Sequence, residues 1–151
     1  MKKTRSGRAN RMRLILPALS VNEGVARTAV AAFCAQCDPS ATELADIKCA
    51  VSEAVTNCIV HGYKDKVGMI YITVVLYENR EVKIEVRDKG VGIEDVKTAR
   101  QPLFTTDAAN ERSGMGFTVM ESFCDGIRVT SAPGKGTKVT MYKRLTKKRS
   151  I

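Results

Sequence analysis

The chain has 151 residues, of which 44% are hydrophobic and 27% are charged, and its formal net charge is +9. This length suits a single domain with one core, and the hydrophobic share excludes a disordered chain. No apolar run approaches the roughly 20 residues of a membrane span, and the run at 14–19 is too short for a secretory signal, so we expect a cytoplasmic protein without a membrane anchor.

The positive charge is concentrated at the two ends of the chain. Residues 1–13 contain six Lys or Arg, residues 143–151 contain five, and neither segment contains an acid. The body between them, residues 14–142, holds 14 basic residues against all 16 acids, which is a formal charge of −2. We therefore expect basic, disordered tails and no nucleic-acid-binding face on the fold itself.

The cysteines indicate neither a metal site nor a disulfide framework, because they are odd in number. Cys34 and Cys37 form a CxxC motif, but a zinc site needs four ligands, and no second CxxC or His pair follows. The motif also lacks the strand and turn of a thioredoxin-type redox pair. We expect small, reduced, buried residues at positions 34, 37, 49, 58 and 124.

The first half of the chain is predicted to form a strand and two helices. Residues 13–19 are a candidate strand, and residues 22–36 are alanine-rich with helical spacing of their apolar side chains. Asp38 is the predicted N-cap of the second helix, which should run to about His61 and stop at Gly62. Its apolar face is formed by Leu44, Ile47, Val51, Val55 and Cys58.

The second half is predicted to form two β-hairpins separated by an irregular segment and a short helix. Residues 69–78 and 81–88 alternate apolar and polar side chains, as do residues 126–132 and 136–144. Residues 93–113 are irregular and polar, and a short helix follows them. Because the helices must cover one face of the sheet, the fold class is α/β (α+β), a two-layer sandwich with a mixed or antiparallel sheet.

The second helix carries an unusual polar stripe. Glu53, Asn57 and His61 are four residues apart, so they share one side of a regular helix beside small and apolar neighbours. A solvated helix face with a capping histidine explains the stripe as well as a binding site does. We expect His61 to be structural or to support neighbouring residues of such a site.

Two glycine motifs favour the binding site. Asp88 ends a predicted strand and is followed by Gly90 and Gly92, which allow a ligand to approach the backbone closely. Gly114 and Gly116 stand where the short helix opens, and free N–H groups at a helix start favour phosphate. Each motif is weak alone, but together with the polar helix they indicate a nucleotide site.

Four segments, EAVTNCIVHG, DKGVGI, SGMGF and GKGTKV, resemble the ATP-binding boxes of the gyrase, Hsp90, histidine-kinase and MutL superfamily. Within it, RQPLFTTDAANERSGMGFTVME and VSEAVTN are similar to the sporulation anti-sigma-F factor family, serine kinases of endospore-forming bacteria. The similarity spans about residues 13–145. It implies a histidine-kinase-like ATPase domain there, between tails at 1–12 and 146–151.

The resemblance implies that the chain binds ATP and Mg²⁺. Asn57 would be the Mg²⁺ ligand, and one protein ligand suffices because Mg²⁺ keeps waters and takes phosphate oxygens. Asp88 would accept a hydrogen bond from the adenine amino group, with Thr137 supporting it. Gly90 and Gly92 would line the pocket for the base.

The resemblance also implies a reaction centre under a lid at residues 100–113. Arg112 would reach the terminal phosphate and stabilise its charge. Glu53 would be the base that accepts the proton of the attacking hydroxyl. The remaining nucleotide contacts implied for the lid and the amides after it are Thr105, Thr106, Ser113, Gly114, Met115 and Gly116.

The function implied is an anti-sigma factor that holds a sporulation sigma factor away from RNA polymerase. It would also use ATP to phosphorylate a serine of an anti-anti-sigma protein. The alternatives are a relative with a stress-response sigma partner, an ATP-switched binding module without transferase activity, and a nucleic-acid binder that uses the tails. Glu53 disfavours the binding module without transferase activity, and the acidic body disfavours the nucleic-acid binder. Walker A and the eukaryotic kinase motifs are absent from the sequence.

The resemblance further implies a homodimer. The alanine-rich helix at 22–36 and the strand before it are the candidates for a self-complementary patch. Glu23 and Arg27, one turn apart, are candidate partner contacts, although an ordinary ion pair within the helix explains them equally well.

Overall fold

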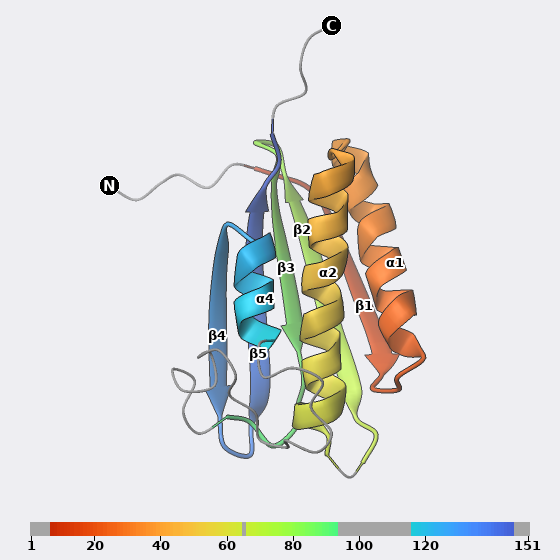
Figure 1. The fold of residues 1–151 in the computed structure, drawn as a ribbon, viewed down its shortest axis with the longest axis vertical. Helices are drawn as coiled ribbons and strands as arrows, with labels where there is room; N and C mark the ends of the chain where they lie inside the picture. Colours follow the sequence, from red (N-terminus) through yellow and green to blue (C-terminus); the bar gives the residue numbers. More distant parts are fainter. Residues whose placement is uncertain (1–6, 65, 94–115, 147–151) are drawn as a thin grey trace, which may run out of the picture.

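The computed structural model describes residues 7–64, 66–93 and 116–146 (Figure 1). Within these residues the chain forms a strand, two α-helices, a β-hairpin, a third α-helix and a second β-hairpin. In chain order the elements are β1 (Arg8–Pro17), α1 (Asn22–Cys34), η1 (Ala35–Cys37), α2 (Ala41–Asn57), η2 (Cys58–Gly62), β2 (Met69–Tyr77), β3 (Glu81–Arg87), α4 (Gly116–Phe123), β4 (Gly126–Ala132) and β5 (Gly136–Arg144).

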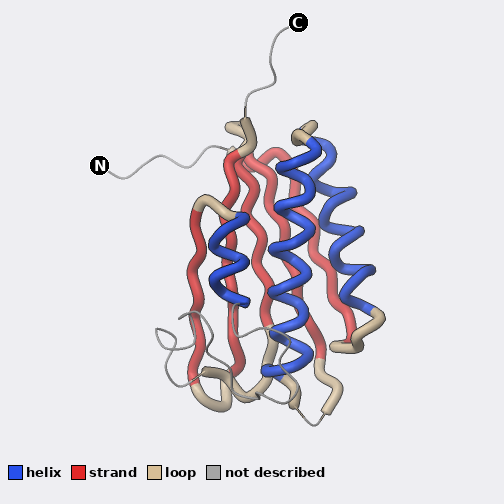
Figure 2. Tube along the Cα trace, in the orientation of Figure 1, coloured by secondary structure: helices blue, strands red, loops and turns tan. Residues whose placement is uncertain are grey.

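The described strands form one five-stranded sheet in the order β1-β2-β3-β5-β4, and every neighbouring pair is antiparallel. The helices α1, α2 and α4 lie side by side on one face of this sheet, and no helix of the described residues lies on the other face (Figures 1 and 2). The predicted two-layer sandwich and both predicted hairpins are therefore confirmed, with a fully antiparallel sheet.

The core lies between the sheet and the helices, where side chains alternate along each strand. On β2 and β3 every second residue is buried toward the helices, as the period of two predicts, and Val75 of β2 is buried as well. Full burial of one such aliphatic side chain contributes roughly 1.5–3 kcal/mol. The largest side chains with under 2% exposure are Ile47, Ile70, Ile72, Leu76, Met120, Met141, Val30, Val51, Val55, Val74, Val82 and Val86.

The first strand starts earlier than the sequence predicts. β1 begins at Arg8, and residues 8–12, expected in a disordered tail, pair with β2 from Tyr77 to Val74. The first four residues of β1 are exposed, so backbone pairing at the sheet edge orders them rather than a buried side chain. Hydrophobic periodicity cannot detect such a segment, and a truncation at residue 12 would remove half of the strand.

The N-cap of α2 is Ser40, so the prediction of Asp38 was wrong. Ser40 Oγ accepts the amide of Glu43 at 3.1 Å, and the Ser40 amide donates to Glu43 Oε1 at 2.9 Å, which together form a capping box. Asp38 instead has a left-handed backbone, with φ of 50°, where η1 ends. The serine has the glutamate three residues later that a capping box needs, and Asp38 does not.

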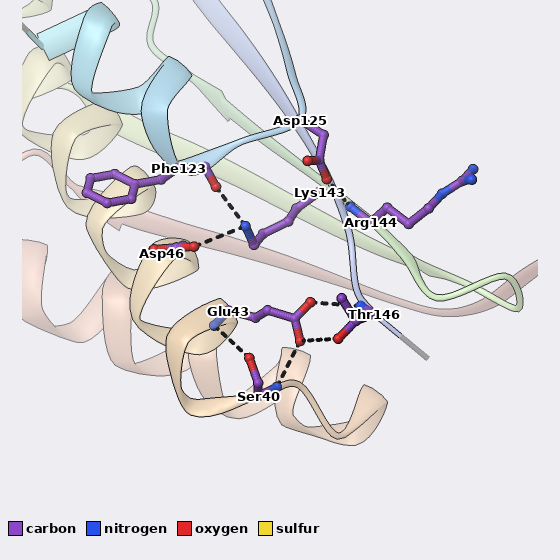
Figure 3. Close-up of polar contacts among 8 residues, drawn as sticks. All are labelled: Ser40, Glu43, Asp46, Phe123, Asp125, Lys143, Arg144 and Thr146. Atoms are coloured by element: carbon purple, nitrogen blue, oxygen red, sulfur yellow. Dashed lines mark hydrogen bonds and ion pairs between the residues drawn. The ribbon is translucent and has the colours of Figure 1, made fainter. Parts of the chain in front are cut away.

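The carboxylate of Glu43 also fastens the end of β5 to α2 (Figure 3). It accepts the Thr146 amide at 2.8 Å and the Thr146 hydroxyl at 3.3 Å. Beside it, Lys143 Nζ lies 3.2 Å from Asp46 Oδ2 and donates to the Phe123 carbonyl at 3.0 Å. These contacts hold the end of α4 and the end of β5 against the start of α2.

Glu43→Ala is expected to lower the free energy of unfolding by roughly 1–3 kcal/mol, because several donors lose their acceptor. Burial alone would raise the pKa of the Glu43 carboxyl, but hydrogen bonds from Ser40 and Thr146 outweigh it and lower the pKa below its ordinary 4.5. The stabilisation by ionised Glu43 is therefore present above pH 4.5 and is lost as the pH falls through the folded-state pKa.

Urea unfolding at pH 7 and at pH 3 measures both effects. Glu43→Gln is the matched control, because it keeps the capping-box side chain and removes only the charge. A loss below about 0.5 kcal/mol in Glu43→Ala would contradict the assignment, since that is the range of ordinary surface substitutions.

Candidate functional site

Asp88 is the buried centre of the site. It follows β3 directly and is 3% exposed. Its Oδ1 accepts the Gly90 amide at 2.9 Å and the Thr137 amide at 3.3 Å, and its own amide donates to the Thr137 carbonyl at 2.9 Å. The carboxylate is thereby fixed between the end of β3 and the start of β5.

The electrostatic environment of Asp88 is unfavourable for its charged form. Burial raises the pKa of the Asp88 carboxyl, and hydrogen bonds from Gly90, the Cys58 thiol and Thr137 offset this only in part. Burial raises the pKa of the Cys58 thiol as well, and the neighbouring Asp88 raises it further, so Cys58 stays a neutral donor. A fixed, buried carboxylate with a raised pKa is characteristic of functional sites.

Three glycines from three segments close around Asp88. A Cβ on Gly62 would lie 2.8 Å from Asp88 Cγ, and one on Gly136 would lie 2.1 Å from the Asp88 carbonyl oxygen. A Cβ on Gly90 would lie 1.9 Å from the carbonyl oxygen of Gly62, so no side chain fits here. The sequence predicted Gly90, but it treated Gly62 only as a helix stop and missed Gly136.

Gly62 reaches this position because α2 ends in a π-turn. The Tyr63 amide donates to the Cys58 carbonyl, five residues back, at 3.0 Å, and the Val91 amide donates to the Gly62 carbonyl at 3.0 Å. Such π-turns occur frequently at functional sites. The HGY sequence at the helix end does not reveal the wider turn, so this feature could not be predicted.

The segment after Asp88 is fixed to the β4–β5 hairpin. Gly92 has φ of 76°, and a Cβ there would lie 2.0 Å from the Ala132 carbonyl oxygen. The Ser131 hydroxyl accepts the Ile93 amide at 2.8 Å and lies 2.8 Å from the Thr137 hydroxyl. Thr137 therefore supports Asp88 through its backbone, while its hydroxyl bonds to Ser131.

Glu53 and Asn57 approach the same end of the fold from α2. Both are half-buried and one turn apart, so they share the helix face that the sequence predicts. His61 lies within the π-turn, and its direction does not follow from 3.6 residues per turn. Figure 1 shows the end of α2, the end of β3 and the start of β5 at one end of the sandwich.

The predicted lid and most of the predicted phosphate-binding residues lie outside the described residues. Gly116 is the first residue of α4, which confirms the short helix opening after the second glycine motif. Free amides at such a helix start suit phosphate. The predicted contacts outside the described residues are Thr105, Thr106, Arg112, Ser113, Gly114 and Met115.

The two candidate partner contacts form an ion pair within α1. Arg27 Nη1 lies 3.4 Å from Glu23 Oε1, which also accepts a hydrogen bond from the Ser52 hydroxyl of α2. The hydrogen bond between Glu23 and Ser52 joins α1 to α2, and a contact with another protein stays a prediction.

All five cysteines are free, and the expectation that they are buried holds for Cys34 and Cys58 but is wrong for Cys49, which is exposed. Burial, assisted by the neighbouring Cys37, raises the pKa of Cys34 to about 12, which disfavours a reactive thiolate. The described residues contain no cluster of three or more His, Cys, Asp or Glu that suits a metal ion. No helix in the described part of the chain has the length and apolar character of a membrane span.

Comparison with protein families matches residues 16–143 to the histidine kinase-like ATPase domain. An anti-sigma F factor of Caldanaerobacter subterraneus is 56% identical over 140 residues, which cover 93% of this chain and 97% of the relative. An anti-sigma F factor of Clostridium acetobutylicum is 53% identical over 135 residues, covering 89% of this chain and 94% of that protein.

Solved structures show the same fold at low sequence identity. The RsbU and RsbW domains of a Mycobacterium tuberculosis protein superpose with a TM-score of 0.69 at 21% identity, over 93% of this chain and 34% of that one. The histidine kinase domain of a blue-light activated kinase from Erythrobacter litoralis gives a TM-score of 0.54 at 20% identity, over 82% of this chain and 61% of that one. Because the family match spans residues 16–143 and the two relatives are 56% and 53% identical, the chain belongs to the anti-sigma F factors, within the histidine kinase-like ATPase domain family.

Proposed function

We propose that the chain is an anti-sigma factor and an ATP-dependent protein serine kinase. It binds a sporulation sigma factor, blocks transcription from it, and phosphorylates a serine of an anti-anti-sigma protein. The observation that carries the proposal is the buried Asp88 carboxylate in its glycine-walled site, at the same end of the fold as the last turns of α2, the helix of Glu53 and Asn57. The sigma factor follows from the relatives, which are named anti-sigma F factors.

The adenine base and the Mg²⁺ ion would each find a suitable protein ligand in the proposed site. Asp88 Oδ1 already accepts two backbone amides, and the carboxylate keeps acceptor capacity for the adenine amino group. The glycines let three chain segments pack directly against Asp88 and against one another, which fixes the carboxylate for a base. Asn57 offers an amide oxygen, a ligand type that Mg²⁺ takes together with phosphate oxygens. Bound Mg²⁺ would neutralise charge on the phosphates.

Glu53 is the proposed general base. It lies one turn before Asn57 on the same face of α2, so its carboxylate approaches the phosphate end of a nucleotide whose base is at Asp88. There it accepts the proton of the attacking serine hydroxyl, while Arg112 stabilises charge on the transferred phosphate. The lid residues Thr105, Thr106 and Ser113 and the amides of Gly114 to Gly116 complete the proposed nucleotide contacts.

The proposed homodimer uses the end of β1, the start of α1 and the start of β2. Large apolar side chains are exposed here, and exposed apolar patches mark interaction sites. Glu23 and Arg27 border this surface and are proposed to contact the partner proteins. Since sigma factors act on RNA polymerase, the proposed location is the cytoplasm. The exposed fractions are 47% for Ile15, 43% for Leu19, 77% for Val21, 50% for Val25 and 38% for Met69.

Incubation with γ-labelled ATP, Mg²⁺ and the anti-anti-sigma protein tests this function, with mass spectrometry to locate the label. We expect the label on one serine of the partner protein. If ATP changes binding of the partner but no label is transferred, the chain is an ATP-switched binding module and the kinase proposal fails. If the label appears but a stress-response sigma factor is bound instead, only the sporulation partner is wrong.

A further inference from the structure

The described helices cover one face of the sheet and leave its other face uncovered (Figures 1 and 2). Residues flanking the buried positions of β2 and β3 point to this face, because side chains alternate along a strand. The pairing register places Arg11, Val75, Lys83 and Tyr142 in one row across β1, β2, β3 and β5. All five strands contribute side chains to this surface, which we call the open face.

The open face is strongly basic. Eight basic side chains stand on it against the two acids Glu81 and Glu85, a formal excess of six positive charges. The two acids already pair with cations, Glu85 with Lys138 at 3.8 Å and Glu81 with Arg144 at 3.5 Å. The basic residues are Arg8, Arg11, Arg13, Lys83, Arg87, Arg128, Lys138 and Arg144.

The charge count of the sequence missed this face for two reasons. It assigned Arg8, Arg11, Arg13 and Arg144 to the tails, and it averaged the two layers of the fold over the remaining residues. The helices carry an acidic set on the opposite side of the sheet, which brings the body close to neutral. A charge of −2 for residues 14–142 therefore describes neither surface. The acids of the helix layer are Glu23, Glu43, Asp46, Glu53 and Glu121.

A groove of about 540 Å³ lies on the open face across β1, β2 and β3. Arg8 and Arg11 line it from β1, and Lys83 and Glu85 line it from β3. The Glu85 carboxylate is the one acid in the lining, and it is paired with Lys138. Its floor on β2 includes the ring of Tyr77. Neighbouring strands are roughly 4.8 Å apart. The strands β1 and β3, which carry the cations, are therefore about twice that distance from each other, on either side of the β2 floor.

We propose that this groove binds single-stranded nucleic acid, with phosphates on Arg8, Arg11 and Lys83 and a base stacked on Tyr77. Guanidinium groups bind phosphate oxygens through paired N–H donors. Basic grooves with aromatic rings on an open sheet hold single strands through backbone charge and base stacking.

An acidic protein segment fits this groove less well. Protein interfaces concentrate their binding energy in a buried apolar or aromatic centre with a polar rim. Among the described residues, no exposed large hydrophobic side chain lines the groove. Val75 is on the floor but only 6% exposed, so Tyr77 is the one ring surface that the groove residues offer.

Fluorescence anisotropy with a labelled 20-nucleotide oligo(dT) and oligo(U) tests the proposal on the full chain, between 50 and 200 mM salt. The groove variant replaces Arg8, Arg11 and Lys83 by Gln, and its matched control replaces Lys147, Lys148 and Arg149 by Gln, so both lose three positive charges. Each removed phosphate contact lowers the slope of log K against log salt by about 0.7 for a single strand. We expect the groove variant to lose at least about tenfold in affinity and about 2 in slope, and the control to lose little.

Tyr77→Leu is expected to lower the affinity by about tenfold with an unchanged salt slope, because stacking carries no charge. Circular dichroism checks that each variant is folded. If the triple variant does not fold, Arg11→Gln alone replaces it, because Arg11 is exposed on an edge strand.

Three outcomes would overturn the proposal. Equal losses in the groove and tail variants would show attraction to net charge alone, and absence of binding at 50 mM salt would exclude the site. Competition by polyglutamate as strong as by oligo(dT), with no effect of Tyr77→Leu, would assign the groove to an acidic protein.

Discussion

Asp88→Asn is expected to lower the affinity for ATP by about 10- to 100-fold, which corresponds to roughly 1.5–3 kcal/mol for a hydrogen bond to a charged group. The carboxylate that would accept the adenine amino group is replaced by an amide, whose N–H₂ faces another donor. The Asn oxygen can still accept the Gly90 and Thr137 amides that Asp88 Oδ1 accepts now, so the loop keeps its shape.

The same variant is expected to unfold at an equal or higher urea concentration than the wild type at pH 7. Because burial raises the folded-state pKa of Asp88 above its ordinary 3.8, the folded protein binds this proton more readily than the unfolded one. The ionised carboxylate therefore costs stability at neutral pH, and this cost disappears as the pH falls through the folded-state pKa. Asn carries no such cost at any pH.

Calorimetry with Mg·ATP and urea unfolding measure the two effects on one sample. A stable variant that has lost ATP binding would show that Asp88 serves the ligand rather than the fold. Wild-type affinity in Asp88→Asn, or equal binding of GTP and ATP by the wild-type chain, would remove Asp88 from the base pocket.

Glu53→Gln is expected to slow phosphorylation of the anti-anti-sigma protein by roughly 10²–10⁴-fold, the usual loss when a general base is removed. The lower end applies if the transition state is loose, because phosphoryl transfer then depends more on positioning. Gln keeps the size and the helix propensity of Glu, so α2 should persist. Asn57 and the glycine walls are unchanged, and we therefore expect ATP and the sigma factor to bind as in the wild type.

Single-turnover rates at saturating ATP separate this loss from a loss of binding. Glu81→Gln is the matched control, because it removes one carboxylate on the open face, where Glu81 pairs with Arg144. We expect wild-type rates from the control. A wild-type rate in Glu53→Gln would reduce Glu53 to a polar residue of the helix face and leave the kinase without its proposed base.

The sequence predicted the architecture because strong periodic patterns specify it. The alternating runs at 69–78 and 81–88 became β2 and β3, and the apolar stripe of α2 is buried at Ile47, Val51 and Val55. It failed where no periodic burial exists. The exposed start of β1 depends on backbone pairing, and the capping box at Ser40 depends on two local hydrogen bonds.

For the site, the sequence pointed to candidate residues such as Asp88 and Asn57, but not to their surroundings. Gly62 and Gly136 approach Asp88 only because distant segments meet there, and the π-turn that brings Gly62 has no sequence pattern. The basic open face likewise appears only when alternate residues of five strands are placed on one side.

A crystal structure of the chain with Mg²⁺ and a non-hydrolysable ATP analogue would test the proposed site most directly. We predict the adenine amino group within hydrogen-bond distance of the Asp88 carboxylate, and Mg²⁺ coordinated by the Asn57 amide oxygen. A nucleotide bound elsewhere, or a base at this site whose amino group faces away from Asp88, would contradict the account.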